Sequence, residues 1–166
     1  PAATAHGYWH FPKIDNLRPV RIIAYEPDHL HELMDGDLND GAVKNIGYMK
    51  AYAQTLNQPG WSYTLVENGH IICCSGIVDM WPGVGEAWFI ASSKIHENVR
   101  PFVRFAKTDI MEKVTTENNL WRVQGVCKED WPAARRFARL MGFKEEGLMR
   151  KYGPEQADYI RIAKVT

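Results

Sequence analysis

A short apolar run that leads into an amphipathic helix is the feature that most constrains the fold of this chain. Residues 87–91, AWFIA, form an unbroken apolar stretch, which suits a strand that is buried on both faces. A polar loop over Ser92–Asn98 follows, and apolar residues then recur at helical spacing from Val99 to about Thr115. Because free backbone N–H groups at a helix start attract anions, we expect chemistry at this junction.

The other expected elements are arranged around this unit. The dipeptide Asn68-Gly69 lies between two apolar runs and predicts a β-hairpin. Asp28 is the expected cap of the first helix, and Gly142 is expected to end the last one. Further strands are predicted at Val20–Tyr25, Trp61–Glu67, His70–Met80, Leu120–Cys127, Lys144–Tyr152 and Asp158–Val165, and further helices at Pro27–Met34, Lys44–Leu56 and Pro132–Met141.

This order predicts an α+β fold with a mixed, mostly antiparallel central sheet flanked by helices. A helix connects the 87–91 strand to the strand that begins at Leu120, so these two strands should form one parallel pair. We expect a single domain over residues 19–166. It is preceded by an arm, residues 1–18, whose aromatic residues Tyr8, Trp9 and Phe11 would pack on the domain or on a protein partner.

Composition excludes several classes of function. The 166 residues carry a formal net charge of +0 and the pI is about 7.4, so nothing indicates nucleic-acid binding. No apolar run approaches the ~20 residues that cross a bilayer, and no signal peptide opens the chain, so we expect a cytoplasmic protein. The six histidines show no metal-ligand spacing, and Cys73, Cys74 and Cys127 lie in apolar strands as expected packing residues.

Three stretches resemble the GNAT superfamily of acetyl-CoA-dependent N-acyltransferases. Residues 86–93, EAWFIASS, are similar to the fourth strand of histone-acetyltransferase-type members, which a glutamate begins. Val99-Arg100 lies where the family has its Arg-Gly-x-Gly pyrophosphate loop, and residues 134–143, ARRFARLMGF, resemble the late helix that ends in Gly-Phe. The resemblance covers roughly residue 19 to the C-terminus and implies the GNAT-like fold.

The chain also departs from the family pattern. Pro101 and Val103 replace the glycines of the pyrophosphate loop, so the close approach of backbone N–H groups to phosphate is lost there. Ala138 replaces the tyrosine that often acts as general acid, and Trp131 replaces the late-helix Asn. The degenerate loop and the closing helix further resemble small phage proteins of GNAT-like fold, of the internal virion protein A type.

The resemblance implies a candidate site. Acetyl transfer needs a base to neutralise the attacking amine, and Glu86 is the candidate, on the strand face of Trp88. The alternative is a solvated Glu. Arg100, Arg104 and Lys94 would bind pyrophosphate by charge, or else form a solvated helix face. The cofactor-binding residues that the resemblance implies are Phe89, Ile90, Ala91, Ser92, Lys94, Val99, Arg100, Arg104, Arg136 and Phe137; Phe137 also suits the core.

Two functions follow from these observations. The first is an acyltransferase that moves an acetyl group from acetyl-CoA to an amine, on a small molecule or a protein, in the cytoplasm of a cell or of a phage host. The second is a non-catalytic module of the same fold, a phage assembly or virion protein that uses its aromatic arm to bind a protein. Loss of the loop glycines favours the second function, and Glu86 with the late helix favours the first.

Overall fold

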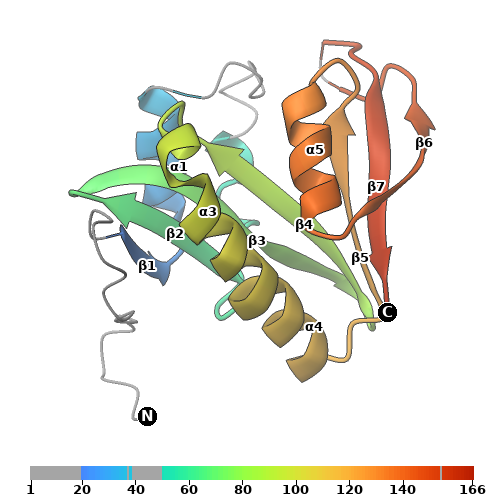
Figure 1. Cartoon of the computed structure of the whole chain (residues 1–166), viewed down its shortest axis with the longest axis horizontal. Coiled ribbons are helices and arrows are strands. Elements are labelled where there is room, and N and C mark those ends of the chain that lie inside the picture. The colour runs from blue at the N-terminus through green and yellow to red at the C-terminus, as the bar shows by residue number, and fades with distance from the viewer. Residues whose placement is uncertain (1–19, 37, 39–49, 154) are drawn as a thin grey trace. The chain divides into compact units, whose positions relative to one another are not determined.

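The computed structural model describes residues 20–36, 38, 50–153 and 155–166 (Figure 1). The aromatic arm over residues 1–18 therefore lies outside the described residues. In chain order the elements are β1 (Val20–Ala24), α1 (Pro27–Asp35), β2 (Ser62–Glu67), β3 (His70–Trp81), β4 (Val84–Ala91), α3 (Ile95–Phe105), the π-helical segment η1 (Ala106–Glu112), α4 (Lys113–Glu117), β5 (Arg122–Lys128), α5 (Pro132–Leu140), β6 (Lys144–Met149) and β7 (Tyr159–Val165).

The strands form one mixed sheet in the order β1-β2-β3-β4-β5-β7-β6. β1 pairs with β2, β2 with β3, β5 with β7 and β6 with β7, all antiparallel, whereas β4 and β5 are parallel. The predicted fold class is confirmed: the sheet is mostly antiparallel, has one parallel pair and is flanked by helices. The insertion of β7 between β5 and β6 did not follow from the sequence.

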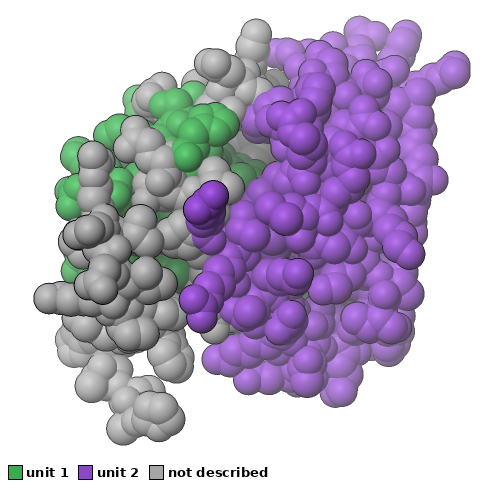
Figure 2. Space-filling model, in the orientation of Figure 1, with its two compact units in different colours: residues 1–76, 89–98 green, residues 77–88, 99–166 purple. Residues whose placement is uncertain are grey.

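The chain divides into two compact units (Figure 2). Unit 1 comprises residues 1–76 and 89–98, and unit 2 comprises residues 77–88 and 99–166. Strands β3 and β4 each belong in part to both units, so the prediction of one domain over residues 19–166 stays a prediction.

Unit 1 contains the predicted hairpin. Asn68 and Gly69 connect β2 to β3 with φ of 51° and 80°, the left-handed conformations that a two-residue hairpin turn requires. Helix α1 covers part of the unit's core with Leu30, Leu33 and Met34, which are all buried.

The expected cap of α1 was wrong. Glu26, not Asp28, is the N-cap, and the backbone N–H of Glu26 donates to Nδ1 of His29 at 3.1 Å in a reciprocal capping box. Asp28 is the second residue of the helix, and its negative charge there still interacts favourably with the helix dipole. Of the helix predicted at residues 44–56, the described part is helical at residues 50–52, and the preceding residues lie outside the description.

The central helix differs from its prediction at both its start and its middle. It begins at Ile95, so the expected polar loop over Ser92–Asn98 was too long, and Arg100 lies in the second turn instead of at the helix start. A π-helical stretch, η1, interrupts it. Residues Phe102, Ala106, Ile110 and Val114 are nevertheless all buried.

In unit 2, the ring of Phe102 stacks on that of Phe137 of α5, with ring centroids 5.8 Å apart. This aromatic contact therefore joins α3 to α5. Trp81 and Trp121 are 53% and 56% exposed.

Candidate active site

The parallel ladder between β4 and β5 is short. Its register covers three residue pairs, from Val84 with Arg122 to Glu86 with Gln124. In unit 2, β4 continues to Trp88 and β5 to Lys128, so both strands run on beyond the register. A Cβ at Gly125 would lie 3.0 Å from the carbonyl oxygen of Ala87, which is tighter than most Cβ contacts, so a larger residue there would require a small backbone shift at the ladder's end.

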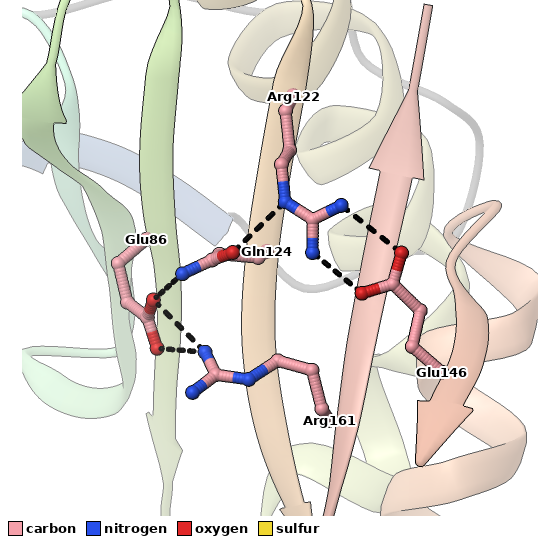
Figure 3. Close-up of polar contacts among 5 residues, drawn as sticks. All are labelled: Glu86, Arg122, Gln124, Glu146 and Arg161. Atoms are coloured by element: carbon pink, nitrogen blue, oxygen red, sulfur yellow. Dashed lines mark hydrogen bonds and ion pairs between the residues drawn. The ribbon is translucent and has the colours of Figure 1, made fainter.

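Glu86 lies at this end of the ladder, and its carboxylate is held by two neighbours (Figure 3). Gln124 of β5 donates from Nε2 to Oε2 of Glu86 at 3.0 Å. Arg161 of β7 approaches both carboxylate oxygens with Nη1, at 3.4 Å from Oε2 and 3.5 Å from Oε1. The side chains of Glu86 and Arg161 are each 26% exposed. Both neighbours are donors, so they suit an ionised carboxylate. Two polar side chains thus hold the carboxylate of Glu86.

The contacts extend from Glu86 across β5 to β6. Nε of Arg122 donates to Oε1 of Gln124 at 2.9 Å, and the two Nη atoms of Arg122 donate to the two carboxylate oxygens of Glu146 at 3.0 and 2.5 Å. The hydrogen bonds with Arg122 lower the pKa of Glu146, and the same contacts raise the pKa of Arg122. We call Glu86, Gln124, Arg122, Glu146 and Arg161 the strand-crossing network.

The strand-crossing network lies on the sheet face that faces away from α5. Along β5, Arg122 and Gln124 are half-buried, whereas the alternate residues Val123 and Cys127 are buried. On β6, Glu145 pairs with Arg135 of α5, whereas Glu146, at the register shift between Glu145 and Gly147, pairs with Arg122 of β5. Figure 3 shows the five side chains in front of the strands and the helices behind them.

The predicted cofactor residues of unit 1 follow β4 into the start of α3. Phe89 is 37% exposed, Ile90 is half-buried and Ala91 is buried. Lys94 is exposed. Ser92 is buried, and its Oγ has no hydrogen-bond partner among the described residues. A buried hydroxyl of this kind suits a ligand that offers a polar atom.

The predicted cofactor residues of unit 2 lie on α3 and α5. Arg100 and Arg104 of α3 and Arg136 of α5 are exposed, as their alternative reading as solvated helix residues requires. The ring of Phe137 packs on Phe102, which fits its reading as a core residue. The side chain of Val99 lies outside the description. The structure thus brings Glu86 into a network, and among the described residues no hydrogen bond or ion pair joins these arginines to it.

The sequence analysis identified Glu86 but not the other four members of the strand-crossing network. Arg122 and Gln124 alternate with apolar residues along β5, a signal for a strand with one polar face. Arg161 interrupts the last apolar strand in the same way. The alternation identifies the face but not the partners, because the position of β7 between β5 and β6 is not visible in the sequence.

Other kinds of site find little support in the described part of the chain. No group of three or more His, Cys, Asp or Glu side chains could hold a metal ion there. Cys73, Cys74 and Cys127 are buried free thiols, as predicted. None of the described helices has the length and apolar character needed to span a bilayer.

Comparisons with known proteins identify the fold. No protein-family model matches the sequence, and no curated protein matches it. Among solved structures, Ard1 from Thermoplasma volcanium is similar with a TM-score of 0.70 at 11% identity, over 89% of this chain and 97% of that one.

A GNAT-family acetyltransferase from Bacillus anthracis has a TM-score of 0.62 at 13% identity, over 88% and 94% of the two chains. The ribosomal-protein-S18-alanine N-acetyltransferase from Escherichia coli has a TM-score of 0.62 at 15% identity, over 89% and 94%. The chain therefore shares its fold with GNAT-family N-acetyltransferases.

Proposed function

We propose that this chain is an acyl-CoA-dependent N-acyltransferase that transfers an acetyl group to an amine in a ternary complex. The observation that carries the proposal is Glu86: a half-buried carboxylate, held by Gln124 and Arg161, at the end of the parallel β4–β5 ladder. The fold shared with GNAT-family acetyltransferases supports the same activity.

The described residues fit an acyl-CoA in two respects. The β4–β5 register ends at Glu86, and Ser92 Oγ is buried without a hydrogen-bond partner among the described residues. When bound, acetyl-CoA supplies the acetyl group as an activated thioester. We propose that the backbone of Phe89, Ile90 and Ala91 and the side chain of Ser92 contact it.

Glu86 is the proposed base. An amine attacks only when it is neutral, and most amines are protonated at pH 7, so a carboxylate must take a proton from the ammonium. The proton would pass to a carboxylate oxygen of Glu86, directly or through a water molecule. Arg161 donates to the same carboxylate and helps to hold it in place.

Charged side chains replace the missing glycine loop in this proposal. Because α3 begins at Ile95, its first-turn N–H groups precede Pro101 and are not removed by it. We propose that Lys94, Val99, Arg100 and Arg104 hold the pyrophosphate, and that Arg136 and Phe137 contact the remainder of the CoA. Arg100, Arg104 and Arg136 are exposed and therefore accessible to a phosphate.

Calorimetric titration with acetyl-CoA and with CoA, followed by an acetyl-transfer assay over a panel of amines, tests the proposal. We expect micromolar binding by the unchanged chain. Glu86→Gln should keep this affinity and lose at least about a hundredfold in kcat, because the amide cannot accept the proton. Glu145→Gln is the matched control and should keep activity, because the Glu145 carboxylate pairs with Arg135 of α5 and does not belong to the strand-crossing network.

No heat with millimolar CoA or acetyl-CoA would contradict the proposal. The acceptor class we propose is an amine on a small molecule or a protein; the E. coli structural neighbour acts, by its name, on an alanine of ribosomal protein S18. The buried free thiols of the described part suit a reducing compartment, so we propose a cytoplasmic location.

A non-catalytic binding module is the second candidate function. The exposed rings of Trp81 and Trp121 favour it, because exposed tryptophans are typical of protein interfaces. In this case the chain would be a phage assembly or virion protein of GNAT-like fold, with the aromatic arm over residues 1–18 as a further contact. Absence of acyl-CoA binding together with binding to a virion protein would support it.

A further inference from the structure

We propose that Gln124 is a positioning residue for Glu86, and that Arg122, held by Glu146, sets the direction of the Gln124 amide. The inference rests on the proposed role of Glu86 as base. It adds three residues from β5 and β6 that no sequence motif indicated. Each step depends on hydrogen bonds of the strand-crossing network.

Arg122 fixes the orientation of the Gln124 side-chain amide. A glutamine side chain has an oxygen that only accepts and a nitrogen that only donates. Arg122 has donors alone, so the oxygen must face Nε of Arg122, at 2.9 Å. The nitrogen then faces the carboxylate of Glu86, at 3.0 Å. The reversed amide would place donor against donor and oxygen against carboxylate, so Arg122 leaves one favourable orientation.

Glu146 holds the guanidinium group of Arg122 in place. Both Nη atoms of its guanidinium bind the Glu146 carboxylate, and Nε remains for Gln124. A planar guanidinium can satisfy both partners at once because its donors form a rigid fork. A lysine ammonium in the same place is a single point of charge and cannot reproduce this geometry. The orientation of Gln124 therefore depends on an arginine at position 122.

The two carboxylate oxygens of Glu86 differ in their contacts. Oε2 receives the short hydrogen bond from Gln124 and the Arg161 contact at 3.4 Å, whereas Oε1 has only the Arg161 contact at 3.5 Å. Gln124 thus holds one oxygen and leaves Oε1 to take the proton. The charged groups near Glu86 are Arg161 on β7 and Arg122 on β5, with Glu146 beyond; Asp79 lies on the neighbouring strand β3.

A second arginine–glutamate pair of the chain provides a matched control for the pair formed by Arg122 and Glu146. Arg135 binds Glu145 through two donors at 2.9 Å each. The side chains of Arg122 and Arg135 are both 27% exposed. Arg122→Lys and Arg135→Lys therefore make the same change in two similar ion pairs, of which only one contacts Gln124.

The experiment measures steady-state kinetics and the side-chain amide signals of Gln124 in ¹⁵N NMR spectra. We expect Arg122→Lys and Gln124→Met to lower kcat by about ten- to a hundredfold while the KM for acetyl-CoA stays unchanged, because the base is misplaced and the cofactor contacts are not. Arg135→Lys should leave kcat within about twofold. In Arg122→Lys, but not in Arg135→Lys, the two Gln124 side-chain amide protons should move from their positions in the unchanged chain towards those of a solvated glutamine.

The two readouts separate this inference from the proposed function. If the unchanged chain transfers no acetyl group, the proposed function fails, and the NMR comparison alone decides whether Arg122 orients Gln124. Unchanged Gln124 amide signals in Arg122→Lys would overturn the inference. An equal loss of kcat in Arg122→Lys and Arg135→Lys would also overturn it, because a general loss of stability would then explain both.

Discussion

The three cysteines show how burial sets the chemistry of single residues in this chain. Burial raises the pKa of the Cys127 thiol to about 11 and that of Cys74 to about 12, and it raises the pKa of Cys73 well above the ordinary value. The nucleophilic form of a cysteine is the thiolate. These residues therefore act as small apolar side chains at neutral pH, in agreement with the sequence analysis.

We predict that iodoacetamide at pH 8 leaves all three thiols unmodified in the folded chain. At that pH about one Cys127 side chain in a thousand is ionised, and access is blocked as well. The same treatment in denaturant should add three labels, which intact-mass spectrometry would count. Labelling of the folded chain within minutes would show that a thiol is exposed or activated.

At the scale of elements, the π-helical segment has an explanation in the spacing of apolar residues. Phe102, Ala106, Ile110 and Val114 recur every four residues and are all buried. A regular α-helix turns about 100° per residue, so each step of four would rotate the stripe by about 40°, and three steps by about 120°. The wider turn of η1 offsets this rotation, and the four side chains keep one buried face.

Removal of one exposed residue from η1 should therefore restore a regular helix. Without Lys107, the four apolar residues follow each other at spacings of four, three and four, and their directions fall within about 60° in an α-helix. We expect this deletion to change the free energy of unfolding by less than about 1 kcal/mol. Insertion of an alanine after Lys107 should cost about 2 kcal/mol or more, because part of the stripe leaves the core.

Urea unfolding of the two variants beside the unchanged chain measures this difference. The deletion variant should also keep its helical signal in far-ultraviolet circular dichroism. If the deletion destabilises the chain as much as the insertion does, the apolar spacing is not what maintains the π-helical turn.

At the scale of the whole molecule, the pH dependence of stability should reflect the two ion pairs of β6. Arg135 lowers the pKa of Glu145, and Arg122 lowers the pKa of Glu146, each below the ordinary value of 4.5. A carboxylate whose pKa is lower in the folded state stabilises the fold fully above pH 4.5. This contribution shrinks as the pH falls below 4.5, where the unfolded chain binds the proton first, and it is lost below the folded pKa.

We predict that the double variant Glu145→Gln, Glu146→Gln is less stable than the unchanged chain at pH 7 and that the difference is smaller at pH 3. Urea unfolding at the two pH values measures it. Glu155→Gln is the control, since Glu155 is exposed and belongs to no ion pair of the described residues. An equal difference at pH 7 and pH 3 would mean that the two ion pairs do not contribute through charge.

The sequence predicted the architecture of the molecule better than its candidate site. Local signals were sufficient for the hairpin at Asn68-Gly69, for the helix before Gly142 and for the parallel β4–β5 pair. They also singled out Glu86. They could not reveal Gln124 and Arg161 as its neighbours, because these contacts join residues 38 and 75 positions apart in the chain. Pairing across strands depends on the sheet order, which local patterns do not determine.

The brevity of the β4–β5 ladder has a mechanical consequence for unit 2. Three residue pairs join these strands, whereas seven join β5 to β7. Separation of β4 from β5 would therefore break fewer residue pairs than separation of β5 from β7.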